Sequence, residues 1–330
     1  MTEPLLKVEN LRTQFRTEGG LVKAVDGVSF AVQPGETFAL VGESGCGKSV
    51  TALSIMGLIP NPPGEIVSGK IEFNGVDLLE LSGREMREIR GSKIGMIFQE
   101  PMSSLNPVLT ILSQLTEALR IHTDLSKNAA NDRAVELVNM VGIADAKTRM
   151  KQYPHQLSGG QRQRIMIAMA MSCSPQLLIA DEATTALDVT IQAQILDLMK
   201  DVTEQSGTAL LIITHNLGIV ARYANRVAVM YAGKLREVGE AVEMYTEPRH
   251  PYTIGLLRSV PRLDSEKGTP LAPIAGEIPD LTNLPSGCAF SPRCHWAIDK
   301  CFEENPLLEE TSSGKKVACF EHQSVALNVQ

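Results

Sequence analysis

Apolar and polar residues predict alternating strands and helices over roughly the first 240 residues. Short apolar runs have the length and composition of buried strands, at 37–41, 93–98, 177–181, 209–213 and 226–230. Apolar residues at helix spacing occur between these runs, as over 190–205, where Gly207 ends the pattern. Strands that alternate with helices favour an α/β fold class with a largely parallel sheet.

Two parts of this region depart from the alternation. Residues 5–15 and 22–32 have loose strand patterns, and residues 69–75 form a predicted hairpin strand closed by an Asn-Gly turn. Residues 107–153 carry helix-spaced apolar positions without a strand between them, which predicts a helical insertion over about 105–156. We therefore expect one α/β domain over residues 1–245 that contains this insertion.

The remainder of the chain, residues 246–330, has a different character. Eight prolines between positions 248 and 292 interrupt every candidate helix, and few apolar residues are periodic. Four of the six cysteines fall in the last 45 residues, at Cys288, Cys294, Cys301 and Cys319. In a reducing cytosol, clustered thiols indicate a metal site more often than disulfides. The pattern predicts a small, loop-rich module that a metal holds together.

Composition limits the class of partner. The formal net charge is −7, aromatic residues make up 4%, and no basic run stands out, all of which argue against nucleic acid. No run approaches 18 apolar residues, and the N-terminus lacks a basic-then-apolar signal. We expect a soluble, cytoplasmic protein whose membrane role, if it has one, comes through a partner.

Residues 42–49 carry the strongest chemical signal. The stretch from Gly42 to Ser49 matches the phosphate-binding pattern G-x-x-x-x-G-K-[ST] between a predicted strand and a predicted helix. Its glycines let backbone N–H groups point at phosphate oxygens, and the helix dipole adds positive potential. Lys48 can reach the β- and γ-phosphates, and Ser49 can bind Mg²⁺. A glycine-rich turn that binds nothing is the weaker alternative, so the loop predicts binding of a nucleoside triphosphate.

Two further stretches suit the same chemistry. The apolar run 177–181 ends on Asp181 and Glu182, which suits Mg²⁺ coordination and activation of water; an acid pair that only caps the next helix is the alternative. Residues Ser158 to Gln161 read Ser-Gly-Gly-Gln at a predicted helix start, where bare N–H groups offer a second phosphate-binding surface.

Cys46, beside Lys48 and a helix N-terminus, is expected to be a reactive thiol that bound ATP protects; a buried, inert residue is the alternative.

These stretches, with Gln99, Asp188 and His215, occur in the order and spacing of the ATP-binding cassette (ABC) ATPases, which the chain resembles over about residues 5–240. The resemblance implies a P-loop ABC nucleotide-binding domain: a RecA-like core, an antiparallel β subdomain and an inserted helical subdomain. It also implies a head-to-tail dimer with ATP and Mg²⁺ bound between one subunit's phosphate loop and the other's Ser158–Gln161 signature. The one departure is Ala183 where the family usually has proline, and we expect little effect because both acids remain.

The resemblance assigns roles to individual residues. Glu182 matches the general base, His215 the residue that senses the γ-phosphate, and Gln99 the glutamine that contacts Mg²⁺ and water. Phe15 resembles the aromatic that stacks on adenine, although an ordinary core phenylalanine explains it equally well. Asp181, Ser49 and Gln99 are the implied Mg²⁺ ligands, and the implied nucleotide contacts are Phe15, Gly42, Glu43, Ser44, Gly45, Cys46, Gly47, Lys48, Ser49, Val50, Gln99, Ser158, Gly159, Gly160, Gln161 and Asp188.

A narrower resemblance comes from residues 98–107, 249–253 and 287–294, which are similar to those of the dipeptide/oligopeptide and nickel importer ATPases. That family implies a [4Fe–4S] cluster on the four late cysteines, with zinc as the alternative. It implies two membrane permeases, a second ATPase subunit (a paralogue or a second copy of the chain) and a solute-binding protein. The expected place is the cytoplasmic face of the inner membrane. The alternatives are transport of nickel or another small solute, a soluble ABC ATPase that acts on nucleic acid, and an adaptor that binds ATP without turnover.

Overall fold

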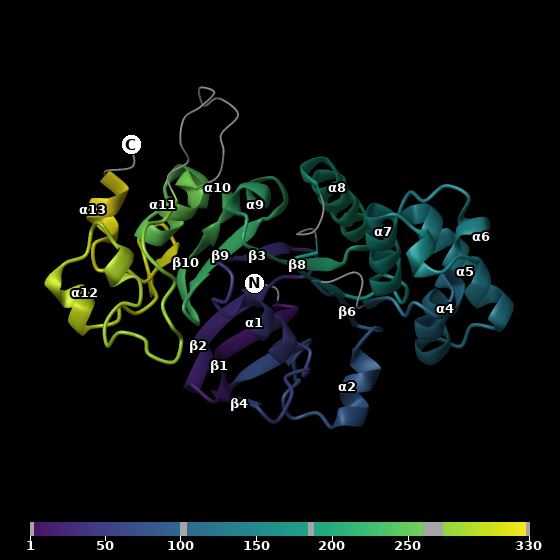
Figure 1. Ribbon diagram of the computed structural model, residues 1–330, viewed down its shortest axis with the longest axis horizontal. Coiled ribbons are helices and arrows are strands. Elements are labelled where there is room, and N and C mark those ends of the chain that lie inside the picture. Colours follow the sequence, from purple (N-terminus) through teal and green to yellow (C-terminus); the bar gives the residue numbers. More distant parts are fainter. Residues whose placement is uncertain (1–2, 100–103, 184–187, 260–272, 328–330) are drawn as a thin grey trace. The chain divides into compact units, whose positions relative to one another are not determined.

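The computed structural model describes residues 3–99, 104–183, 188–259 and 273–327 (Figure 1). It contains two compact units that interleave along the sequence. The first unit takes residues 1–5, 32–37 and 78–213, and the second takes residues 6–31, 38–77 and 214–330. Residues 246–330 therefore group with the N-terminal strands and the phosphate loop, while the helical insertion groups with the strands that follow it.

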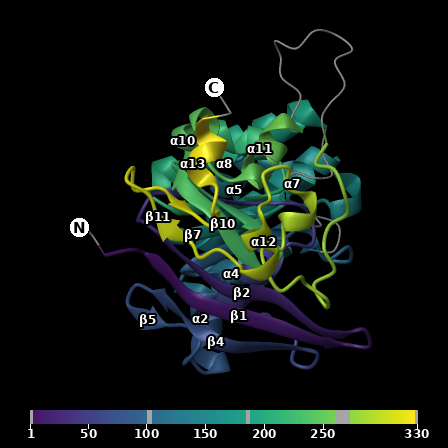
Figure 2. The same cartoon turned by 90° about the vertical axis from the view of Figure 1, so that its left-hand side faces the viewer.

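The second unit contains a four-stranded sheet in the order β2-β1-β4-β5. Its long strands lie side by side in Figure 2. Asn74 and Gly75 both have positive φ, 51° and 76°, where β4 turns into β5, so the predicted Asn-Gly turn is confirmed. The strands are β1 (Leu6–Thr17), β2 (Gly20–Val32), β4 (Gly64–Phe73) and β5 (Val76–Asp77).

A second set of strands in this unit positions the phosphate loop. The five residues of β3 (Thr37–Val41) are all buried, as the apolar run predicted, and β3 pairs in parallel with β9 (Arg226–Tyr231). Antiparallel pairing continues from β9 to β10, β12 and β11. The last two strands, β12 (Lys316–Val317) and β11 (Glu309–Glu310), come from the C-terminal part of the chain and extend the sheet beyond β10 (Lys234–Glu240).

Residues 246–330, called the C-terminal extension below, obtain their core from this sheet. The ring of Phe290 lies 5.2 Å from that of Tyr231 on β9 and 5.4 Å from that of Tyr252, measured between centroids. Lys315 forms a buried ion pair with Glu237 on β10, at 3.4 Å. Helices in and next to the extension are α10 (Ala241–Thr246), α11 (Pro251–Arg258), α12 (Asp299–Glu303) and α13 (His322–Leu327), with a 3₁₀ turn at Ser291–Arg293.

The first unit has three parallel strands in the order β8-β7-β6. A Cβ on Gly95 of β6 would lie 2.5 Å from the Ala170 carbonyl at the end of α7, so this close approach requires glycine. Ser82 and Glu85 form a capping box at the start of α2. The elements are α2 (Gly83–Ile89), β6 (Ile94–Ile97), α7 (Gly159–Ala170), β7 (Leu177–Asp181), α8 (Val189–Ser206) and β8 (Ala209–Thr214).

The helical insertion forms a bundle with α7, in teal in Figure 1. Leu115 and Leu119 of α4 and Leu137 and Val138 of α5 are fully or almost fully buried, as their helix spacing predicted. Arg164 of α7 donates to the Val141 carbonyl at 2.7 Å, which satisfies the C-terminal end of α5. The insertion comprises α4 (Ile111–His122), α5 (Lys127–Met140), α6 (Ala146–Arg149) and a 3₁₀ turn at Pro154–Gln156.

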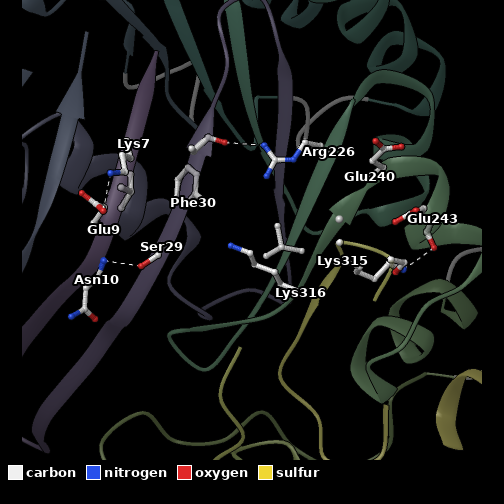
Figure 3. A pocket seen from close by; sticks show the side chains of 16 residues that line it. Lys7, Glu9, Asn10, Ser29, Phe30, Arg226, Glu240, Glu243, Lys315 and Lys316 are labelled. Atoms are coloured by element: carbon white, nitrogen blue, oxygen red, sulfur yellow. Dashed lines mark hydrogen bonds and ion pairs between the residues drawn. The ribbon is translucent and has the colours of Figure 1, made fainter. Parts of the chain in front are cut away.

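The surface of the second unit carries a groove. A groove of about 640 Å³ in the second unit lies between residues of β1 and β2 and residues of β10, α10 and the C-terminal extension (Figure 3). Its wall mixes charges of both signs, such as Lys7, Glu9, Lys316 and Glu240, and includes none of the predicted site residues. In the described part of the chain, every helix is too short or too polar to cross a membrane.

Candidate nucleotide site and four-cysteine site

The phosphate loop, residues 42–49, connects β3 to α1 (Lys48–Ile55). Two of its glycines are fixed by close backbone approach: a Cβ on Gly42 would lie 2.2 Å from the Met230 carbonyl oxygen, and one on Gly47 would lie 2.1 Å from that of Ala24. Gly47 also has φ 108° and caps α1. Only glycine meets both demands, so β2 and β9 fix the path of the loop.

Lys48 lies inside this loop. Its ammonium donates to the carbonyls of Gly42 at 2.8 Å and Glu43 at 3.0 Å, and the residue is 4% exposed. Ser49, half-buried in the first turn of α1, follows it. An ammonium placed among loop carbonyls has its charge at the N-terminus of a helix, where phosphate oxygens would be stronger acceptors than carbonyls.

Cys46 does not have the reactive environment that the sequence suggested. The residue is 2% exposed, and burial raises the pKa of its thiol despite Lys48, whose ammonium nitrogen lies 3.9 Å from the sulfur. Desolvation of a thiolate at this depth exceeds the attraction of one nearby cation. The expectation of an accessible thiolate is therefore wrong, and Cys46 packs as a small buried residue.

Gln99 and Glu182 are joined by a side-chain hydrogen bond in the first unit. The Gln99 amide donates to a carboxylate oxygen of Glu182 at 2.8 Å, across 83 residues of sequence. Glu182 is 7% exposed, has φ 44°, and donates its backbone N–H to the Ile213 carbonyl at 2.9 Å. Positive φ is uncommon outside glycine and turns the residue away from the path of β7. Asp181, 5% exposed, is the last residue of β7 itself.

Ser158 to Gln161 begin α7 with their N–H groups near the surface. Ser158 and Gln161 form a reciprocal capping box, in which the Gln161 N–H donates to the Ser158 hydroxyl at 3.3 Å and the Ser158 N–H donates to the Gln161 amide oxygen at 3.0 Å. Ser158 and Gly159 are exposed and Gly160 is half-buried. The helix start is thus capped by its own side chains and accessible at the surface.

The remaining predicted residues have simpler surroundings. Asp188 caps α8 by accepting the Ile191 N–H at 2.9 Å, and His215 is exposed one residue after β8. Phe15 on β1 is half-buried, and its ring lies against Gly64 on β4, where a Cβ would be 2.7 Å from a ring carbon. This contact fits a core phenylalanine and leaves stacking on adenine a prediction.

The two units divide the predicted nucleotide residues. Phe15, the phosphate loop and His215 belong to the second unit, and Gln99, the signature, Asp181, Glu182 and Asp188 belong to the first. The predicted motifs at 98–107 and around Asp181 also include residues 100–103 and 184–187, which lie outside the described part of the chain.

The four late cysteines line one small cavity in the second unit, together with Phe290 and other apolar residues. All four are free thiols. Burial, together with the neighbouring cysteines, raises the pKa of Cys294 to about 11 and that of Cys319 to about 12. Gly287 has no space for a Cβ, which would lie 2.3 Å from the Cys301 carbonyl, and Cys288 donates its N–H to that same carbonyl at 2.8 Å. The backbone thus brings distant thiols together.

The chemistry around these thiols fits a metal centre, although the cavity is closed. Its free volume is about 10 Å³, and in the described ranges no three His, Cys, Asp or Glu side chains are arranged to hold a metal ion. Arg236 supports the fit: it is 1% exposed, its Nε has no hydrogen-bond partner, and its charge interacts with Cys288 and Cys319. A buried cation suits an anionic thiolate centre better than neutral thiols.

Sequence reasoning missed the contacts between the C-terminal extension and the phosphate loop. Arg293 forms an ion pair with Glu43 at 2.7 Å, and the hydroxyl of Tyr252 accepts the Glu43 N–H, also at 2.7 Å. Both residues lie in stretches that resemble the peptide importer ATPases, at 249–253 and 287–294. That resemblance marked the residues, but nothing in the sequence pointed to their partner 209 or 250 positions away.

Comparison with known proteins agrees with this geometry. The family model described as ABC transporter matches residues 25–185, and the model described as oligopeptide/dipeptide transporter, C-terminal region, matches residues 237–301. The oligopeptide transport ATP-binding protein AppD of Bacillus subtilis (strain 168) is 53% identical over 316 residues, covering 96% of each chain. The dipeptide transport ATP-binding protein DppD of the same organism is 53% identical over 318 residues, covering 96% of this chain and 95% of its own.

A solved structure gives the same assignment. The dimeric post-hydrolysis state of the ATP-binding cassette MJ0796 bound to ADP and Pi superposes with a TM-score of 0.64 at 26% identity, covering 72% of this chain and 98% of that one. The predicted P-loop ABC fold and the ATPase activity it implies are confirmed. The chain belongs to the ABC transporter family of ATP-binding proteins and carries the C-terminal region of the oligopeptide/dipeptide transporters.

Proposed function

We propose that this chain is the ATP-hydrolysing subunit of a bacterial ABC importer that takes up dipeptides or oligopeptides. The observation that carries the proposal is the identity of 53% with peptide transport ATP-binding proteins, which extends through the C-terminal extension as well as the cassette. A soluble ABC ATPase acting on nucleic acid has no support among these relatives. Import of nickel or another small solute by the same mechanism is the alternative.

The residue roles are proposed from the resemblance to ABC ATPases together with the chemistry available at each position. Lys48 and the loop N–H groups would bind the ATP phosphates, and Ser49 and Asp181 would hold Mg²⁺, which supplies charge neutralisation at the phosphates. Glu182 would accept the proton of the attacking water, with its carboxylate oriented by Gln99 at 2.8 Å. His215 would sense the γ-phosphate, Asp188 would face the dimer partner, and Phe15 would stack on adenine.

The partners are proposed from the same family. The exposed start of α7 would meet ATP held by a second ATPase subunit, either a paralogue or another copy of this chain. The helical insertion would transmit closure to two membrane permeases at the cytoplasmic face of the inner membrane, and a solute-binding protein would deliver the peptide. We keep the division into a cassette, residues 1–245, and the C-terminal extension.

We further propose that Cys288, Cys294, Cys301 and Cys319 hold a [4Fe–4S] cluster with a structural role. Four thiols on one cavity are the donor set of such a cluster, and Arg236 offers a buried positive charge beside them. Protein purified without exposure to air should contain about four irons per chain. Replacing one cysteine by serine should remove the iron. Stoichiometric zinc without iron would overturn the cluster assignment.

The transport proposal is tested by co-expression of the chain with two candidate permeases of a peptide importer. The complex should co-purify, and in proteoliposomes its ATP hydrolysis should rise when peptide and solute-binding protein are added. The Glu182→Gln complex, prepared in the same way, is the control for hydrolysis by contaminants. Stimulation by Ni²⁺ in place of peptide would assign the nickel alternative, and absence of any permease in the complex would contradict a role in import.

A further inference from the structure

Glu43, the second residue of the phosphate loop, is held by the C-terminal extension at two points. The two terminal nitrogens of Arg293 donate to the two carboxylate oxygens of Glu43, at 2.7 and 3.0 Å, in the bidentate geometry that makes such pairs strong and directional. The Glu43 N–H donates to the Tyr252 hydroxyl at 2.7 Å. The backbone and the side chain of one loop residue are therefore both fixed by residues outside the cassette.

The groups that hold Glu43 are themselves rigid. The Arg293 side chain is 4% exposed and also donates to the carbonyls of Ala275 and Ile274, at 3.0 and 3.2 Å. Burial disfavours its charge, but the hydrogen bonds to Glu43 and Tyr231 outweigh this and raise the pKa of Arg293, which stays ionised. Arg293 and Glu43 lie 250 positions apart in the sequence, so their ion pair connects the C-terminal extension directly to the phosphate loop.

Tyr252 is equally fixed. It is fully buried, and its ring packs against those of Tyr231 and Phe290, with centroids at 4.6 and 5.4 Å. Burial raises the pKa of its hydroxyl well above the usual range, so the group stays protonated and can accept the Glu43 N–H while keeping its own proton.

Both contacts begin next to a cysteine of the four-cysteine site. Arg293 directly precedes Cys294. His250 hydrogen-bonds through its ring to the backbone of Ala318, which precedes Cys319, and its Nδ1 accepts the Tyr252 N–H at 3.0 Å. Burial lowers the pKa of His250 to about 3, so its ring is neutral and can donate to one side and accept from the other. Two short chains of contacts therefore run from the thiols to the phosphate loop.

We propose that Arg293 and Tyr252 are positioning residues for the phosphate loop, and that the state of the four-cysteine site sets the affinity of the chain for MgATP through them. The positioning part rests on the ATP site alone, and the coupling part rests on the proposed metal centre. Arg293 neutralises a carboxylate that would otherwise repel the phosphates, and Tyr252 fixes the loop backbone whose N–H groups must point at them.

The first experiment measures the dissociation constant for MgATP of full-length protein carrying Arg293→Gln, Glu43→Gln or Tyr252→Phe. We expect Arg293→Gln and Tyr252→Phe to weaken binding roughly 10- to 100-fold, because small misplacements of binding groups have effects of that size. Glu43→Gln should weaken it less, since it also removes the repelling charge. The Arg293→Gln/Glu43→Gln double variant should bind MgATP more tightly than the sum of the two single effects predicts.

Two matched controls separate positioning from a general loss of structure. Tyr245→Phe removes a hydroxyl that likewise accepts a backbone N–H, from Ala221 at 3.1 Å, away from the loop. Arg133→Gln breaks an exposed ion pair with Glu136 on α5. Both should leave MgATP affinity unchanged, and iron content should stay at the wild-type level in all variants. Wild-type affinity in both Arg293→Gln and Tyr252→Phe would overturn the positioning role.

The second experiment tests the coupling by comparing metal-loaded and chelator-stripped wild-type protein. Stripped protein should bind MgATP about tenfold more weakly, and in Arg293→Gln/Tyr252→Phe the difference between loaded and stripped protein should disappear. Equal affinity of loaded and stripped wild-type protein would overturn the coupling. Failure of the wild-type chain to bind MgATP at all would instead contradict the proposed function, so the two failures are distinguishable.

Discussion

The replacement Glu182→Gln tests the assignment of the general base with little disturbance of the fold. Glutamine has nearly the same shape, and its amide oxygen can still accept the hydrogen bond that Gln99 now donates at 2.8 Å. The exchange turns a charge-assisted hydrogen bond into a neutral one, which costs about 1 kcal/mol of folding stability. Loss of a general base slows the chemical step by roughly 10²- to 10⁴-fold, or about 3 to 5 kcal/mol of barrier. The catalytic effect therefore exceeds the structural one several-fold.

The assay is phosphate release in a single turnover, alongside equilibrium binding of MgATP and size-exclusion chromatography. We expect unchanged ATP affinity, strongly slowed release, and accumulation of an ATP-bound dimer. Gln99→Ala should give a smaller rate loss, because it leaves the base in place but removes the amide that orients it. Turnover within a few-fold of wild type in Glu182→Gln, with the variant folded, would refute the role of Glu182 as base.

Three further predictions follow from the local geometry. Gly47→Ala should lower the thermal midpoint and abolish ATP binding, because the new Cβ would lie 2.1 Å from a backbone carbonyl of β2. In Gly45→Ala the new Cβ would have no atom within 4 Å, so this variant should be destabilised only by the φ of 79° at that position. Equal effects of the two variants would contradict the steric argument. Lys315→Met should lower the free energy of unfolding in urea by about 3 to 5 kcal/mol, because the buried Glu237 carboxylate on β10 loses its cation partner. Lys316→Met at the neighbouring position should lower it by under about 1 kcal/mol. Native Cys46 should resist maleimide, with ATPase activity retained, and rapid labelling would show that its burial is wrong.

The phosphate loop was predictable because its requirements are local. Glycines at positions 42 and 47, and a lysine and a hydroxyl residue after them, follow from the curl of the backbone and the charge of phosphate. The buried strands were predictable for the same reason, since a run such as 177–181 has no polar face. The role of such residues is indicated by the residues next to them in the sequence.

Features that depend on distant packing were not predictable from patterns alone. Cys46 was expected to be reactive because its sequence neighbours favour a thiolate, but the residue is 2% exposed in a loop that packs against Met230 of β9, far along the chain. The contact of Gln99 with Glu182 could be inferred only from the resemblance to ABC ATPases. The Arg293–Glu43 pair has no local signal, because a charged residue in a loop is ordinarily solvated.

The central claim is that this chain binds and hydrolyses ATP through its phosphate loop. The most direct test is steady-state hydrolysis of MgATP by the purified wild-type protein and by Lys48→Ala, which removes the ammonium that lies 2.8 Å from the Gly42 carbonyl. We predict saturable hydrolysis by the wild type and a loss of at least 100-fold in Lys48→Ala, in keeping with the removal of one preorganised charge from a phosphate site. Equal hydrolysis by the two proteins would contradict the claim.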